Sequence, residues 1–360
     1  MSHVPAPTNA GIDPAVAAFS RAILDFAEGA AGSSSREHRY SLGGLTVALG
    51  ANGPLYEERL TRALRHAELP PGKGGEVAAR VFAVDAKAPN GMPPPDWPFP
   101  YADRRHLERL HVTAGRDVYV TFNEDTRTWH VFDRRSRRAA IWTEDASCLP
   151  DWEHAFPLRT LLNWLYAPSP LTLAHAAVVG EGACGVLLAG AGGSGKSTTT
   201  AACLDLGLKT CGDDFVAITC GERPRAYSLF DTVKLDERSL AWFPHLEARV
   251  ANSGTAHEAK ARIHLFEARP NLLIASCEVR ALVVPRLAEG ARTRIQPVSK
   301  AVVLKALAPS TLFLVRGTET ETAAKLAALV RRLPTYELPI GGEPPEAASA
   351  IRSLLDESSP

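Results

Sequence analysis

The sequence lacks the features that mark several large classes of protein. Its 40 basic residues are balanced by 40 acidic residues, so the whole chain has no net attraction for nucleic acid or for an anionic membrane. None of its six cysteines forms a Cys-x-x-Cys pair with metal-binding spacing. We therefore expect neither a nucleic-acid partner nor a cysteine-ligated metal, and we expect the cysteines to be buried free thiols.

Long hydrophobic runs are missing as well. The longest candidate, residues 171–189, is interrupted by His175, Glu181 and several glycines, whereas a membrane span needs roughly 18 apolar residues. Residues 1–9 are rich in proline and alanine and have no apolar core, so they do not resemble a signal peptide. These observations predict a cytoplasmic protein without a membrane partner.

Apolar residues make up 45% of the 360-residue chain, which is enough for a sizeable core and for two domains. Residues 118–122 and 129–132 alternate like antiparallel strands, and the basic cluster 134–138 between strands is interpreted as a solvated turn. The pattern changes after the prolines at 168 and 170 to strand, glycine loop, helix and strand, which is typical of an α/β domain.

Four segments follow from this reading of the chain. We expect a flexible tail at 1–12, a smaller β-rich α+β domain at 13–167, an α/β domain at 168–340, and a C-terminal helix and tail at 341–360. The first domain should begin with an amphipathic helix at 13–28, after the Asp13-Pro14 start signal. A helix at 320–333 should pack on the sheet of the α/β domain or on a neighbouring subunit.

A glycine-rich loop is the most specific motif in the chain. A short apolar strand, residues 185–189, precedes it, and a helix from Thr198 follows. In this context the loop amides and the helix N-terminus can cradle phosphates, while a lysine reaches the β- and γ-phosphates and a serine ligates Mg²⁺. The residues expected to bind a nucleoside triphosphate are Gly190, Ala191, Gly192, Gly193, Ser194, Gly195, Lys196, Ser197 and Thr198.

Two further features carry candidate chemistry. Asp213 and Asp214 lie between two short strand patterns, where one carboxylate can hold Mg²⁺ and the other can accept a proton from an attacking hydroxyl. A solvated Asp-Asp turn is the alternative. His175 lies in an apolar strand, and a lone histidine there is more often a core residue than a functional one.

The spacing of His175, Lys196 and the pair Asp213-Asp214 resembles the C-terminal catalytic domain of HPr kinase/phosphorylase. The resemblance covers about residues 171–335. It implies a fold like the nucleotide domain of phosphoenolpyruvate carboxykinase, with ATP and Mg²⁺ as ligands. It also implies that Asp214 is the base, that His175 orients it, and that Ser197 and Asp213 hold the metal.

The chain departs from that family at one signature. The family's metal-binding glutamate would fall at Arg238, with only Asp236 and Glu237 nearby, so phosphorylase activity is without support. Residues 227–235 instead resemble divergent HPr-kinase-like proteins found with bacterial lasso-peptide modification genes, which makes Lys234 a candidate for phosphate or acceptor contact. Arg269 loosely matches a family arginine and is a candidate for stabilising the transferring phosphoryl group.

The resemblance therefore predicts an ATP-dependent serine kinase that acts on a peptide or small protein, such as a ribosomal precursor peptide, and that forms a homo-oligomer. Two alternatives stay open at this point. One is a kinase for a small molecule such as serine or a glycan precursor. The other is a nucleotide-sensing regulatory module without phosphotransfer.

Overall fold

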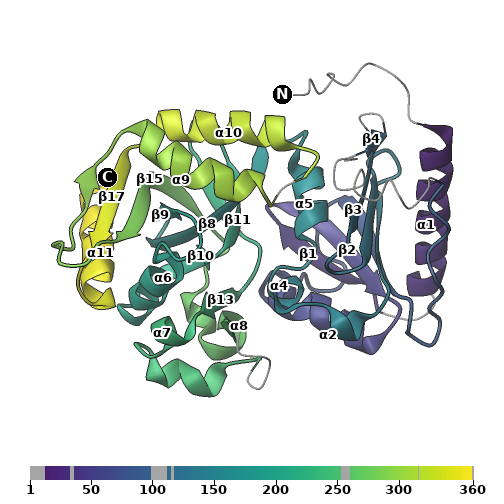
Figure 1. Cartoon of the computed structure of the whole chain (residues 1–360), viewed down its shortest axis with the longest axis horizontal. Coiled ribbons are helices and arrows are strands. Elements are labelled where there is room, and N and C mark those ends of the chain that lie inside the picture. The colour runs from purple at the N-terminus through teal and green to yellow at the C-terminus, as the bar shows by residue number, and fades with distance from the viewer. Residues whose placement is uncertain are drawn as a thin grey trace. The chain divides into compact units, whose positions relative to one another are not determined.

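The computed structural model describes residues 13–32, 36–98, 112–114, 117–252, 260–314 and 316–358, and the expected tail at 1–12 lies outside these ranges (Figure 1). The chain divides into two compact units. Unit 1 comprises Met1–Tyr40, Leu45–Arg59 and Leu69–Pro150, and unit 2 comprises Ser41–Gly44, Leu60–Glu68 and Asp151–Pro360. The architecture is mixed α/β, with separate sheets in the two parts of the chain.

The first sheet contains the segments whose alternating pattern predicted strands. Over the described residues it has the strand order β1-β2-β3-β7-β6-β5-β4, in which β2, β3 and β7 run parallel and the β4 to β7 neighbours are antiparallel. Residues 134–137 of the basic cluster form the expected turn between β6 and β7, and Arg138 begins β7. The strands are β1 (His38–Leu42), β2 (Leu45–Ala51), β3 (Val77–Asp85), β4 (Val112–Ala114), β5 (Val118–Asn123), β6 (Thr128–Asp133) and β7 (Arg138–Thr143).

Helix α1 (Pro14–Gly32) packs on this sheet. It starts where the sequence predicts, because the Asp13 carboxylate accepts a hydrogen bond from the Ala15 amide at 2.8 Å. Its apolar residues, including Phe19 and Ile23, are buried against strands of the sheet. The helix α2 (Pro54–Thr61) and the 3₁₀ helix η1 (Arg62–Ala67) follow β2.

The second sheet contains the glycine-rich loop. Its path is β10-β8-β11-β12-β15-β17-β16, and β9 pairs with both β15 and β8, so that β8, β11, β12, β15 and β9 form a closed ring of paired strands. The strands are β8 (Leu171–Glu181), β9 (Cys184–Ala189), β10 (Lys209–Gly212), β11 (Phe215–Thr219), β12 (Arg225–Ser228), β15 (Ser276–Leu287), β16 (Gln296–Pro297) and β17 (Thr335–Ile340).

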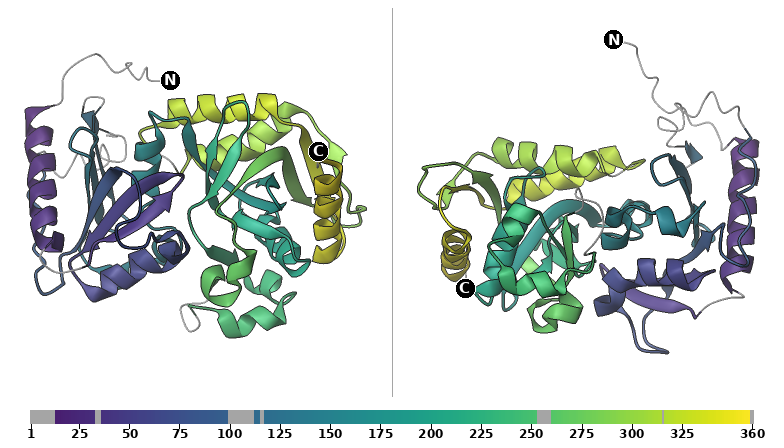
Figure 2. Two further views of the ribbon diagram at one scale, coloured as in Figure 1. Left: turned by 180° about the vertical axis from the view of Figure 1, so that it is seen from behind. Right: turned by 60° about the horizontal axis from the view of Figure 1, so that its bottom comes forward.

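Helices cover both faces of this second sheet (Figures 1 and 2). One face carries α6 (Lys196–Asp205) and α11 (Pro344–Ser358). The other carries α9 (Lys300–Leu312) and α10 (Glu319–Arg332), whose Leu326, Leu329 and Val330 are buried in the core of that face. The helix expected at 320–333 thus packs on the sheet itself.

A small sheet and several short helices complete unit 2. The division between the units falls at Pro150, whereas the expected boundary lay at 167, because α5 packs on β8 and α4 contacts η1, and both partners belong to unit 2. The Trp164 indole of α5, for example, donates a hydrogen bond to the Arg316 carbonyl at 2.7 Å. These elements are β13 (Thr232–Leu235), β14 (Ala261–His264), α4 (Asp151–Ala155), α5 (Arg159–Tyr166), α7 (Glu237–Leu240), α8 (Leu265–Ala268), η4 (Pro244–Arg249) and η5 (Pro270–Leu272), with η3 (Ala146–Cys148) just before the division.

The expectations about membrane spans and about the cysteines can be compared with the described part of the chain. No helix in it is long and apolar enough to cross a membrane. All six cysteines are free, and Cys203, Cys211 and Cys277 are buried, whereas Cys148 is exposed.

Candidate functional site

The glycine-rich loop connects the end of β9 to the start of α6. Gly193 and Gly195 have φ angles of 79° and 96°, in the left-handed region where other residues are strained. A methyl group placed on Gly190 would clash with the Ser194 hydroxyl, so the loop also closes too tightly for a larger residue there. The sequence can follow this path only because glycines stand at these positions.

Lys196 lies inside the loop that it follows. Its side chain is buried, and Nζ donates hydrogen bonds to the Gly190 carbonyl at 2.7 Å and to the Ala191 carbonyl at 3.3 Å. Burial lowers the pKa of Lys196, and the negative charges of Asp214 and Asp213 oppose that shift. The ammonium group is thus held by two carbonyls of the loop and interacts with both carboxylates.

Strand register brings His175 to the same place. Ala176 of β8 pairs with Ala189 of β9, which puts His175 beside the first residue of the loop. On the other edge of β8, His175 pairs directly with Phe215, the residue after Asp214. Because one strand pairs with both neighbours, residues that are far apart in the sequence meet at one point.

His175 and Asp214 contact each other. His175 Nε2 lies 3.4 Å from Asp214 Oδ1, and the two side chains are only 14% and 19% exposed. The imidazole also packs beside the Phe215 ring, with ring centroids 5.1 Å apart, and the His175 amide donates to the Thr311 hydroxyl at 3.0 Å. The histidine is therefore fixed by its strand and aims its Nε2 at the carboxylate.

The two adjacent carboxylates have opposite electrostatic environments. Burial raises the pKa of Asp214, but the hydrogen bond and charge of His175, followed by Lys234 and Lys196, outweigh it and hold that pKa below its usual range. For Asp213, burial and the neighbouring charge of Asp214 raise the pKa, and Ser197 and the Lys234 amide only partly oppose them. Asp214 is consequently the more stable anion of the pair.

Asp213 is the better candidate for a metal ligand. Its side chain is 1% exposed, and its Oδ2 accepts a hydrogen bond from the Lys234 amide at 3.3 Å. Its Oδ1 is buried and has no hydrogen-bond partner among the described residues, which is costly for a carboxylate unless a cation occupies that side. No cluster of three or more His, Cys, Asp or Glu that could hold a metal occurs in the described ranges. Mg²⁺ commonly takes one or two protein oxygens together with substrate phosphates, so Asp213 and Ser197 fit it.

Lys234 also lies at this site. It is on β13, and its Nζ is 5.2 Å from the centroid of the Phe156 ring. Burial lowers the pKa of Lys234, and the charges of Asp214 and Asp151 oppose that shift. The sequence pattern singled out Lys234, but nothing in the sequence indicated the contributions of Phe156 or Thr311, because both depend on packing between distant segments.

Thr198 is held by a contact from another element. Its hydroxyl is 2.8 Å from the Ser239 hydroxyl of α7. The nearby Asp236 caps α7 by accepting a hydrogen bond from the Ser239 amide at 2.7 Å. Asp236 therefore has a structural task in the described chain.

Arg269, which the sequence singled out for stabilising the transferring group, contacts other residues than these in the structure. Its guanidinium donates to Asp205 Oδ1 at 2.6 Å and to the Leu204 carbonyl at 3.4 Å. Asp205 is the last residue of α6, whereas Lys196 is the first, and a helix of this length is about 15 Å long. Arg269 thus neutralises the C-terminal end of the helix, where cations are favoured.

Comparison with known proteins adds little to this geometry. No protein-family model matches the chain, and no curated protein matches it. Among solved structures, the chain is similar to the Hpr(Ser) kinase/phosphatase from Coxiella burnetii, with 13% sequence identity and a TM-score of 0.31 over 52% of this chain and 97% of that one. The function of this chain must therefore be inferred from the residues of the site.

Proposed function

We propose that this protein is an ATP-dependent kinase that transfers the γ-phosphoryl group to a serine-type hydroxyl of a peptide or small protein. The observation that carries the proposal is the contact of 3.4 Å between His175 and Asp214, next to the glycine-rich loop and its lysine. A carboxylate that is kept ionised beside a triphosphate site has the position and charge that a general base needs.

The chemistry assigns each residue a step. The loop amides and Lys196 bind the β- and γ-phosphates, and Asp214 takes the proton from the acceptor hydroxyl as its oxygen attacks the γ-phosphorus. The new oxygen–phosphorus bond forms while the bond to the leaving ADP oxygen breaks. Asp213 and Ser197 would hold Mg²⁺, which supplies charge neutralisation for the phosphates.

His175 has a positioning task in this scheme. It contacts Asp214 through Nε2 and is fixed by the Phe215 ring and the Thr311 hydroxyl. The charge of Lys234 acts on Asp214, and we propose that Lys234 meets the acceptor or the phosphoryl group. The resemblance also favours a ribosomal precursor peptide as acceptor and a cytoplasmic homo-oligomer as the working form.

Two other functions compete with this one. A small-molecule kinase would use the same residues, and only the identity of the acceptor separates the two proposals. A nucleotide-sensing module without transfer is disfavoured, because such a module has no need for a base held ionised next to the phosphate site.

Transfer from γ-labelled ATP tests the proposal. Wild-type protein should label serine-containing peptides, and Asp214→Asn should lose the transfer rate by about a thousandfold while the dissociation constant for ATP stays within about threefold. Asp356→Asn, an exposed carboxylate on α11, is the matched control and should behave as wild type.

Three results would count against parts of this proposal. Transfer by Asp214→Asn at the wild-type rate would remove Asp214 as the base. Labelling of free serine or a glycan precursor, but of no peptide, would favour the small-molecule kinase. ATP binding without transfer to any acceptor would favour the sensing module.

A further inference from the structure

Three parallel strands end at the edge of the sheet where the glycine-rich loop lies. β15 runs parallel to β9 on one side and to β17 on the other. The segments that follow the three strands, starting at Gly190, Ala288 and Gly341, therefore leave the sheet at the same edge. The glycine-rich loop follows β9 at this edge, so a phosphate held by the loop would lie beyond the carboxyl ends of these strands.

Two apolar side chains border the loop at this edge. A methyl group placed on Gly195 would lie 3.3 Å from Ile340 Cδ1 and 3.5 Å from Leu287 Cδ2. Leu287 is 61% exposed at the end of β15, and Ile340 is partly exposed at the end of β17. We call these two residues the Leu287–Ile340 shelf.

The shelf is held by backbone contacts. The amide of Ala288, the residue after Leu287, donates to the carbonyl of Ile340 at 2.9 Å. The Gly341 and Gly342 amides each lie 3.3 Å from the Thr293 hydroxyl oxygen, which accepts from both. A methyl group on Gly341 would clash with the Ala291 backbone, so the two segments pack without room for a side chain. These contacts therefore hold the backbone on which the exposed Leu287 side chain lies.

We propose that the Leu287–Ile340 shelf binds the nucleoside part of the triphosphate, with the base lying against the two apolar side chains. This inference rests on the proposed function, because it requires the phosphates to occupy the loop. A base has an apolar face that gains free energy when it leaves water, and the shelf offers matching apolar surface next to Gly195. The carboxylates and His175 adjoin the strands β8 and β11, so they leave the β15 and β17 edge to the nucleoside.

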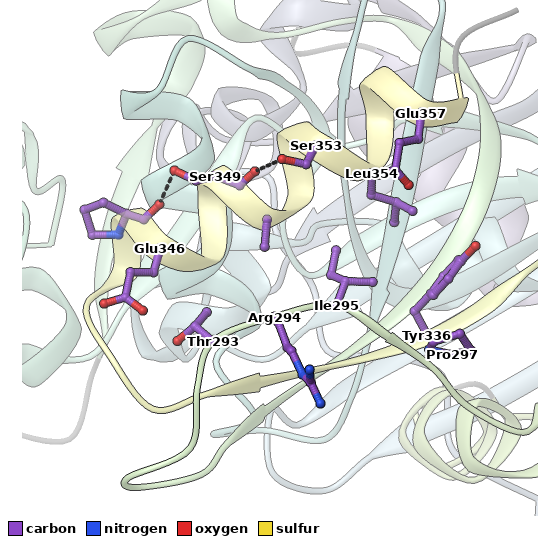
Figure 3. A pocket seen from close by; sticks show the side chains of 12 residues that line it. Thr293, Arg294, Ile295, Pro297, Tyr336, Glu346, Ser349, Ser353, Leu354 and Glu357 are labelled. Atoms are coloured by element: carbon purple, nitrogen blue, oxygen red, sulfur yellow. Dashed lines mark hydrogen bonds between the residues drawn. The ribbon is translucent and has the colours of Figure 1, made fainter.

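A neighbouring groove provides the competing position for the nucleoside (Figure 3). It has a volume of about 770 Å³ and runs along α11, from Thr293 and Glu346 at one end to Tyr336 and Glu357 at the other. Thr293 joins it to the shelf, but neither Leu287 nor Ile340 lines it. Gly195 is not among the residues that line the groove, whereas both shelf residues border Gly195.

Titration calorimetry with two ligands tests the inference. Mg²⁺ with ATP and Mg²⁺ with inorganic tripolyphosphate share the phosphates, and only ATP has a nucleoside. Leu287→Ser should weaken ATP binding by about tenfold and change tripolyphosphate binding by less than about twofold. Lys196→Ala should weaken both ligands. Leu206→Ser, an exposed leucine at the far end of α6, is the matched control and should change neither.

Each remaining outcome decides against the shelf. Equal weakening of both ligands by Leu287→Ser would mean that Leu287 supports only the loop, and no weakening would mean that the nucleoside lies elsewhere. If Ser349→Trp, which fills the groove, weakens ATP and Leu287→Ser does not, then the nucleoside occupies the groove. If the wild-type protein binds neither ligand, the proposed function fails together with this inference.

Discussion

At the scale of single residues, the adjacent carboxylates show how position along one turn separates two roles. The charges of His175, Lys234 and Lys196 stabilise the Asp214 anion, whereas Asp213 Oδ1 is buried without a hydrogen-bond partner among the described residues and burial outweighs the charge of Lys196. The same side-chain chemistry is therefore stabilised as an anion at one position and strained as an anion at the next. A buried carboxylate whose anion is destabilised is a common cost of a binding site.

Removing the charge of Asp213 should stabilise the ligand-free protein. Asp213→Asn eliminates a buried negative charge next to Asp214, so we expect the free energy of unfolding to rise by about 1 kcal/mol in urea titrations with EDTA present. Asp356→Asn should have no measurable effect. A less stable Asp213→Asn protein would show that the carboxylate is satisfied in the ligand-free state.

His66 should make the stability depend on pH. Its Nε2 lies 2.8 Å from the Ser228 hydroxyl, and burial lowers the pKa of His66 although the charge of Asp231 opposes this. The unfolded chain thus takes up a proton near pH 6.5 that the folded chain resists, so stability is present above that pH and is lost as the pH falls below it.

Urea unfolding of wild type and His66→Gln at pH 7.5 and pH 5.5 measures this contribution. We expect the wild type to lose up to about 1.4 kcal/mol per pH unit through this group, and the variant to lose correspondingly less. The measurements at pH 7.5 control for the loss of packing in the variant. An identical pH dependence in both proteins would contradict the assignment.

At the scale of elements, β8 organises the site because it pairs with β9, β10 and β11. One lysine side chain links the end of helix α5 to the start of this strand. Lys325 of α10 donates hydrogen bonds to the Tyr166, Ala167 and Leu171 carbonyls at 3.1, 2.9 and 2.8 Å. These are the carbonyls at the end of α5 and the beginning of β8, where a helix has no partners of its own.

Replacing this lysine should loosen α5 from the sheet. Lys325→Met keeps the aliphatic stem and removes the ammonium donor from three carbonyls, of which only the Tyr166 carbonyl is known to keep other donors, the Ser169 amide and hydroxyl. We therefore expect it to cost about 2 kcal/mol in urea unfolding. Lys305→Met, on the exposed side of α9, is the matched control and should stay within about 0.5 kcal/mol of wild type. Equal stability of the two variants would show that water replaces the lysine without loss.

At the scale of the whole molecule, a segment of the N-terminal half belongs to unit 2. Residues Leu60–Glu68 are part of that unit, and Ala63 and Leu64 are fully buried. The Asp231 amide donates to the Ala63 carbonyl at 3.1 Å, and Arg62 forms an ion pair with Glu267 at 2.8 Å. Together with Ser41–Gly44 and Asp151–Pro360, this segment makes unit 2 a unit of three separate stretches of the chain.

A fragment of residues 151–360 should therefore be less stable than the same unit in the full chain. It lacks the 60–68 segment and exposes the surface that this segment covers, so we expect a lower thermal midpoint by circular dichroism and faster proteolysis. In the full chain, Leu64→Ala should cost about 2–4 kcal/mol in unit 2. A fragment that unfolds at the midpoint of the full chain would show that the segment is dispensable.

The sequence alone determined the features that depend on local rules. The start of α1, the strand and helix around the glycine-rich loop, and the turn at 134–138 each follow from neighbouring residues, so periodicity and turn chemistry predict them. The spacing of His175, Lys196 and Asp213-Asp214 indicated one site, and strand register in the structure explains the spacing. Lys234 was also chosen from a sequence pattern.

Only the tertiary structure decided the features that depend on pairing between distant segments. Strand β3 lies between β2 and β7 in parallel, and parallel partners leave no local turn signal in a sequence. Arg269 could be assigned to the site by its motif, but packing pairs it with the opposite end of α6. The 60–68 segment joins unit 2 and the Leu287–Ile340 shelf meets the loop for the same physical reason. Burial and contact between remote residues are properties of the folded chain, and local sequence does not encode them separately.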